Sequence, residues 1–172
     1  LVWIPIGAVE AQLPRIRLDT IFPAGGQVGT TVEVQITGES AEAATELIFS
    51  HPEIDAIQQQ IPATQFRVAH RKPAAFSVRI GADVPPGRYE VRALGPIGLS
   101  APRSFVVGQT PNSVMHDGNN SRSTPFRLQP GTAVHAKTRA DHRDYFRLQA
   151  TGQLPLLIQI FAQRIDADMS PV

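Results

Sequence analysis

Side chains that could bind a hard metal ion gather in two segments of the last third of the chain. One segment holds Asp117, Asn119 and Asn120 within four residues, and the other, DHRDYFRL, begins with Asp141 and contains Asp144. Carboxylate and amide oxygens are the ligands that Ca²⁺ selects, and a loop that wraps a cation needs them at short spacing. If the fold brings the two segments together, these five residues would form a calcium site.

The same residue types also have a purely structural role. Asn and Asp side chains hydrogen bond to nearby backbone amides and thereby shape turns. In that interpretation Asn119 and Asn120 cap a turn, and Asp144 caps the start of a strand. The sequence leaves both interpretations open, although turn shaping is the commoner role of such residues.

The sequence contains no catalytic motif. It has no cysteine, no Gly-x-Ser-x-Gly elbow and no His-Glu-x-x-His pair. These absences exclude thiol nucleophiles, serine-hydrolase elbows and zincin sites. Asp166 and Asp168 alternate near the end of the chain, where we expect them to face solvent. We therefore predict no catalytic residue in this chain, which would not itself be an enzyme.

Charge and composition narrow the class of partner. The chain has 16 lysines and arginines against 15 acids, a net charge of +1 that argues against nucleic acid or an anionic membrane surface as a partner. Hydrophobic residues make up 42% of the chain, so it is expected to fold. No apolar stretch is long enough to span a membrane. The partner that remains is an unidentified protein or polysaccharide.

Apolar residues alternate along much of the chain and predict strands over residues 17–108. Residues 31–36 place every second side chain on one apolar face. The segment AFSVRIGADVPPGRYEVRAL predicts a hairpin, in which a Pro-Pro-Gly turn joins two alternating runs. We expect Gly25, Gly26 and Gly29 to form a tight turn with positive φ. AEAATE is expected to form a single helical turn, and no long helix is predicted.

Three stretches within this part resemble those of a known family. FPAGGQVGTTVEVQITGES, ELIFSHPEI and ADVPPGRYEVRALGPIGLSAPRSFVVG follow one another as in the IPT/TIG-type immunoglobulin-like modules of large secreted bacterial proteins. The resemblance implies an immunoglobulin-like β-sandwich over residues 12–108. Tyr89 would pack near a turn of this sandwich.

The polar stretch QTPNSVMHDGNNSRSTP interrupts the alternation and predicts a linker over residues 109–120. The β pattern resumes over residues 121–172, with Tyr145 and Phe146 at the start of a core strand. LPLLIQIFAQRI predicts a further strand with one wholly apolar face. Because few residues follow the linker, we expect them to be the first part of a truncated, jelly-roll-like second β-sandwich.

The second part also resembles a known family. DGNNSRSTP followed by DHRDYFRLQATGQLPLLIQIFAQRI is similar to the first half of a bacterial pre-peptidase C-terminal domain. The resemblance is carried by Asp117, Asn119, Asn120, Asp144, Tyr145, Phe146, Gly152, Gln153 and Arg164. Some members of that family bind calcium through such a set. The resemblance also implies that the parent protein is a peptidase or another hydrolase.

Residues 1–11 end in Ala-Val-Glu-Ala, where small residues flank a spacer as at a secretory cleavage site. We interpret this segment as the remnant of a signal peptide, which predicts an extracellular or periplasmic location. The expected function is a non-catalytic accessory region of a larger secreted bacterial protein, which spaces, stabilises or binds. Two alternatives stay open: a calcium-stiffened spacer, and part of a hydrolase whose catalytic domain lies outside this sequence.

Overall fold

The computed structural model describes residues 15–115, 118–137, 142–150, 152, 155–162 and 165. Within these ranges the regular structure consists of β-strands and one short 3-10 turn, η1 (Ala41–Ala43). This confirms the all-β fold class and the single helical turn predicted for AEAATE. The segment interpreted as a signal remnant, residues 1–11, lies outside the described ranges.

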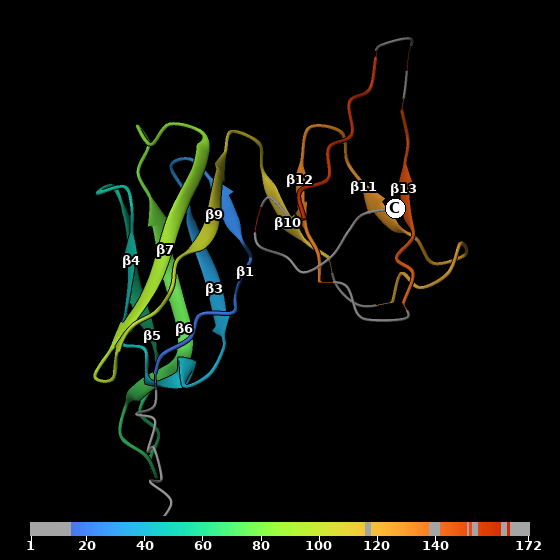
Figure 1. Ribbon diagram of the computed structural model, residues 1–172. Coiled ribbons are helices and arrows are strands. Elements are labelled where there is room, and N and C mark those ends of the chain that lie inside the picture. The colour runs from blue at the N-terminus through green and yellow to red at the C-terminus, as the bar shows by residue number, and fades with distance from the viewer. Residues whose placement is uncertain are drawn as a thin grey trace, which may run out of the picture.

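Two sheets form the first unit of the chain, which covers residues 15–108 (Figure 1). One sheet has the order β1-β3-β6-β5; the other has the order β2-β9-β7-β4, with β8 beside β7. The strands are β1 (Thr20–Phe22), β2 (Gly25–Gln27), β3 (Thr31–Thr37), β4 (Glu46–Phe49), β5 (Ile54–Ile61), β6 (His70–Ile80), β7 (Gly87–Gly95), β8 (Gly98–Leu99) and β9 (Arg103–Gly108). With β2 added at one edge, this is the strand order of the immunoglobulin sandwich.

The core of the first unit draws side chains from both sheets. Val34 and Phe76 come from β3 and β6, and Val91 and Phe105 come from β7 and β9. All four are buried because alternate residues of each strand point between the layers. Burial of one large apolar side chain contributes about 1.5 to 3 kcal/mol, so the shared core is what holds the two sheets together.

Tyr89 lies near the start of β7 and ties the connection from β6 to that strand. Its Oη donates a hydrogen bond to the carbonyl oxygen of Pro85 at 2.6 Å. The rings of His51 and Tyr89 pack edge to face at a centroid distance of 5.3 Å. A tyrosine that bonds back to the preceding corner at this strand is a hallmark of immunoglobulin sandwiches. The predicted packing role of Tyr89 is confirmed.

The predicted hairpin over AFSVRIGADVPPGRYEVRAL is wrong in its pairing, although both strands form. Strand β6 pairs with β3 and β5, whereas β7 pairs with β9 and β4 in the other sheet. The Pro-Pro-Gly segment therefore carries the chain from one layer to the other. Alternation of apolar residues fixes which face of a strand is buried, but it does not specify the neighbouring strand.

The three glycines near the start of the chain have different roles. Gly29 has φ 73° and forms the predicted turn. Gly25 and Gly26 lie in β2 without positive φ, so for them that expectation is wrong. A Cβ on Gly25 would lie 2.1 Å from the carbonyl oxygen of Val106. Gly25 is therefore required by the close approach of β2 to β9, because any side chain there meets backbone.

The second unit begins earlier than the sequence predicts. Its strands are β10 (Asn112–Val114), β11 (Phe126–Leu128), β12 (Ala133–His135) and β13 (Phe146–Leu148). Strand β10 pairs in parallel with β12, and β11 pairs in parallel with β13. Residues 112–114 thus belong to the second unit, and the predicted linker over 109–120 shortens to residues 109–111. The sequence of β10 is polar and lacks apolar alternation, so only its pairing with β12 in the structure identifies it as a strand.

The strand predicted for LPLLIQIFAQRI does not form over its described residues, 155–162. Leu157 and Ile160, one from each alternating set, are 79% and 67% exposed, although Ala162 at the end of the segment is buried. A strand requires a hydrogen-bonding neighbour, and within the described ranges no segment pairs with this one. The predicted strand at Tyr145 and Phe146 does form from Phe146 onward, but Phe146 remains half exposed rather than in a core.

Candidate functional site

Asn119 joins the two segments that the sequence analysis singled out. Its backbone carbonyl accepts a hydrogen bond from the N–H of Tyr145 at 2.8 Å. The side chain is only 5% exposed, and its Nδ2 donates to Met115 Sδ at 3.1 Å and to the Tyr145 carbonyl oxygen at 3.5 Å. The Asn119 segment and the start of β13 therefore lie side by side, as a shared site would require.

The remaining members of the predicted calcium set are placed only in part. Asp144 precedes Tyr145 and is half-buried, whereas Asn120 is exposed. Asp117 and Asp141 lie outside the described residues. Among the residues that are described, no group of three or more His, Cys, Asp or Glu side chains could hold a metal ion.

The described members do not by themselves complete a calcium shell. They supply one carboxylate, from Asp144, where Ca²⁺ takes six to eight oxygen ligands. The amide nitrogen of Asn119 donates to the Tyr145 carbonyl oxygen, and the turn-capping interpretation, which concerns the side-chain oxygens, stays a prediction beside the calcium one. What the described geometry provides is a fixed contact between two loop segments, and calcium remains a prediction.

A shallow groove of about 350 Å³ runs beside β13. Its lining residues are Arg122, Pro125, Tyr145, Phe146, Arg147 and Leu148. Strand β11 pairs with β13, and Phe126 and Phe146 are register partners with ring centroids 6.3 Å apart. Sequence reasoning singled out Tyr145 and Phe146 but missed Arg122 and Pro125, since the contact between the two stretches is long-range.

Two arginines, Arg122 and Arg147, line this groove, and a third, Arg127, lies on the strand paired with β13. Arg127 and Arg147 are register partners on β11 and β13, and Arg122 lines the same groove. Like charges placed opposite each other on adjacent strands are destabilising. In the described part of the chain none of the three makes an ion pair. Guanidinium groups recognise planar carboxylates in a bidentate manner, and the neighbouring rings offer an apolar surface, so the groove suits an acidic ligand.

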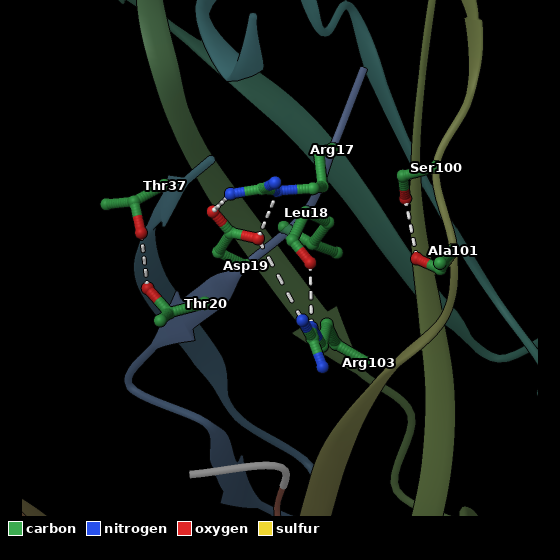
Figure 2. A network of polar contacts seen from close by, with 8 residues as sticks. All are labelled: Arg17, Leu18, Asp19, Thr20, Thr37, Ser100, Ala101 and Arg103. Carbon is green, nitrogen blue, oxygen red and sulfur yellow. Dashed lines mark hydrogen bonds and ion pairs between the residues drawn. The ribbon is translucent and has the colours of Figure 1, made fainter. Parts of the chain in front are cut away.

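A second polar cluster lies at the edge of the first unit, where the sequence analysis proposed no site. Figure 2 shows Arg17 and Arg103 approaching Asp19 from two sides. Arg17 Nε lies 2.7 Å from Asp19 Oδ1, and Arg103 Nε donates to the Leu18 carbonyl oxygen at 2.7 Å. The hydrogen bond from Arg17 holds the pKa of Asp19 below its usual value. The cluster ties the segment before β1 to β9, which is a structural role.

Among the described histidines of the second unit, His135 is the one whose pKa is shifted. It lies on β12, and its Nε2 is 3.1 Å from Asn112 Oδ1 on the paired strand β10. Burial lowers the pKa of His135 below its usual value, so the imidazole is neutral at pH 7. Asn112 Oδ1 accepts a hydrogen bond from Nε2–H of the neutral ring, and this contact stabilises the β10–β12 pair.

Comparison with known proteins does not assign the chain to a family. No protein-family model, no curated protein and no solved structure matched the chain. The resemblances to IPT/TIG-type modules and to pre-peptidase C-terminal domains therefore stay predictions. Among the described residues there is no helix with the length and apolar character needed to cross a bilayer.

Proposed function

We propose that the chain is a non-catalytic accessory region of a secreted protein. In this proposal the immunoglobulin-like unit spaces and orients the second unit, and the second unit binds a protein or polysaccharide through the groove beside β13. The observation that carries the proposal is the junction between the two units, which is short and held by side-chain contacts from both.

The junction spans residues 109–111, between the end of β9 and the start of β10. Gln27 Nε2, on the neighbouring strand β2, donates a hydrogen bond to the carbonyl oxygen of Gln109 at 3.0 Å. From the second unit, Lys137 Nζ lies 4.4 Å from the centroid of the Phe22 ring on β1. A cation over an aromatic face contributes about 0.5 to 1 kcal/mol at an exposed site. A connection this short with contacts on both sides supports a spacer with a preferred orientation.

The groove supports the binding half of the proposal. Arg122 and Arg147 place positive charge beside the ring of Phe146. Uronic acid polysaccharides and acidic peptides both combine a carboxylate with an apolar face, which this arrangement complements. The secreted location rests on the predicted signal remnant.

The junction can be tested by pulsed electron spin resonance, because a chain without cysteine accepts a pair of introduced spin labels at defined positions. Gln35→Cys on β3 and Gln129→Cys in the second unit are exposed and suit labelling. A narrow distance distribution is expected. Lys137→Gln should broaden it, and Lys137→Arg, which retains the cation over Phe22, should not. A broad distribution in the doubly labelled parent would contradict a spacer with fixed orientation.

A calcium-stiffened spacer is the second candidate function. The observation that favours it is the hydrogen bond from the Tyr145 N–H to the Asn119 carbonyl oxygen, which holds the Asn119 segment against the residue that follows Asp144. Asp144 and the side-chain oxygens of Asn119 and Asn120 would hold the ion, together with Asp117 and Asp141. A bound Ca²⁺ would cross-link the two segments and stabilise the second unit.

A further inference from the structure

The hairpin between β5 and β6 concentrates apolar and cationic side chains at one end of the first unit. Its loop extends past the end of the sandwich (Figure 1). Phe66 and Val68 are 84% and 82% exposed, and Ile61 is also exposed. We define residues 57–73 as the hairpin tip. Large apolar side chains that gather at an exposed projection mark an interaction site rather than ordinary surface.

The hairpin tip also carries a net positive charge. It holds three of the 16 lysines and arginines and none of the 15 acids, so the rest of the chain carries a net charge of −2. The three cations are Arg67, Arg71 and Lys72. Within the described residues none of them makes an ion pair, and Lys72 Nζ donates only to the Gln59 side-chain oxygen at 3.2 Å. The charge is therefore free to act on a partner.

The tip is a defined structure, not a loose loop. Thr64 and Arg67 form an antiparallel bridge, with the Thr64 N–H donating to the Arg67 carbonyl oxygen at 2.8 Å. The Phe66 N–H donates to Thr64 Oγ1 at 3.3 Å. Behind this turn, Ile61 pairs with His70. Phe66 is thus held at the extreme end of the hairpin, and its side chain is presented outward.

Apolar and cationic side chains follow one another along the hairpin. Phe66 lies in the end turn and Val68 follows it, whereas Arg71 pairs with Gln60 farther back on the strands, and Lys72 comes next. An anionic bilayer has charged headgroups at its surface and hydrocarbon beneath them. A protein that inserts an apolar end into the hydrocarbon therefore leaves the residues behind that end at the level of the headgroups. Apolar side chains at the front of the hairpin would reach the hydrocarbon boundary while the cations behind them meet phosphate groups. Arg67, in the turn, has a long stem that allows its guanidinium to reach back to the headgroups.

We propose that the hairpin tip binds the surface of anionic membranes, with Phe66 and Val68 inserted at the headgroup boundary and Arg71 and Lys72 on the lipid phosphates. Binding of this kind needs two contributions, because a few apolar side chains or a few cations alone hold a protein only weakly. The tip supplies both. The site is separate from the groove beside β13 and does not depend on the proposed spacer function.

The test is co-sedimentation of the full 172-residue chain with vesicles of phosphatidylcholine that contain about 30% phosphatidylglycerol, and with vesicles of phosphatidylcholine alone. Binding is expected to the anionic vesicles only, and it should weaken as salt is raised. Arg71→Gln with Lys72→Gln should weaken binding about tenfold or more, because each cation at an anionic surface contributes about 1 kcal/mol. Phe66→Ser with Val68→Ser should also weaken binding about tenfold or more, because the two apolar side chains no longer enter the bilayer.

Matched controls separate the tip from general properties of the surface. Ile48→Ser with Leu99→Ser removes two exposed apolar side chains elsewhere, and Arg88→Gln with Arg143→Gln makes the same change in net charge. Both controls should bind like the parent. The substituted residues are all exposed, and unchanged melting curves would verify that every variant folds.

A direct readout of insertion is tryptophan emission from Phe66→Trp in a Trp3→Phe background, which should shift to the blue when anionic vesicles are added. The proposal is overturned if the parent fails to bind anionic vesicles, which would leave the tip to an acidic protein partner. It is equally overturned if the tip variants bind like the parent, if the controls lose binding to the same extent, or if neutral vesicles bind equally well.

Discussion

The chain has two tyrosines, Tyr89 and Tyr145, and the structure gives them different surroundings. The Tyr89 hydroxyl donates to the Pro85 carbonyl oxygen at 2.6 Å and so joins the start of β7 to the crossing from β6. Tyr145 is held through its backbone, by the hydrogen bond from its N–H to the Asn119 carbonyl oxygen at 2.8 Å. Tyr89 thus joins two strands of the first unit, whereas Tyr145 lines the groove of the second unit.

Tyr89→Phe should lower the free energy of unfolding by about 1 kcal/mol, because one side-chain hydrogen bond is lost without a change in packing. For a chain of this size the melting temperature should fall by about 2 to 4 °C. Tyr145→Phe is the matched control and should leave the melting temperature unchanged. A Tyr89→Phe variant that melts at the same temperature as the parent would show that the bond to Pro85 contributes nothing to stability.

At the level of elements, the pairing of β2 with β9 depends on a residue without a side chain. Gly25 faces the Val106 backbone so closely that a Cβ would lie 2.1 Å from its carbonyl oxygen. Gly108, at the end of β9, has open space around its Cα, with nothing within 4 Å of an added Cβ. The two glycines lie on adjacent paired strands but tolerate a methyl group very differently.

Gly25→Ala is therefore expected to destabilise the first unit by about 1 to 3 kcal/mol, the range found when extra carbon atoms are forced into a packed region. Gly108→Ala should change stability by less than about 0.5 kcal/mol. Urea denaturation of the two variants measures the difference. A Gly25→Ala variant as stable as the parent would mean that β2 can move away from β9 at little cost.

For the whole molecule, the central question is how the second unit is stabilised, because its described strands are short and several of its apolar side chains are exposed. The contact of Asn119 with Tyr145 brings two loop segments of this unit together. A cation bound between these segments would offset that deficit. The calcium candidate therefore predicts that the bound ion raises the stability of this unit.

If the calcium candidate is right, millimolar Ca²⁺ will raise the melting temperature, because an ion that binds only the folded state stabilises it by mass action. Asp144→Ala should abolish the rise. Asp83→Ala, which removes an exposed carboxylate from a turn of the first unit, should preserve it. A parent melting curve that does not move with calcium would rule out this function and leave Asn119 as a structural residue.

The sequence alone determined where most strands of the first unit form and which of their faces is buried. Alternation over residues 31–36 and 76–80 is a local property, because side chains on a strand point to opposite faces in turn. The strand order with its β6-to-β7 crossing was not predictable in this way. Neither was the role of Gly25, since both depend on contacts between residues far apart in sequence.

Candidate sites depend even more on tertiary structure. The sequence identified Asn119 and Asp144 as oxygen ligands, but only the fold brought Asn119 against Tyr145 and set Arg122 beside Arg147. A net charge of +1 suggested no attraction to an anionic surface. The fold instead gathers unpaired cations behind an exposed Phe66, because a hairpin brings residues from two strands to one projecting end. Average composition sums charge over the whole chain, whereas a partner meets only the charge presented at one place.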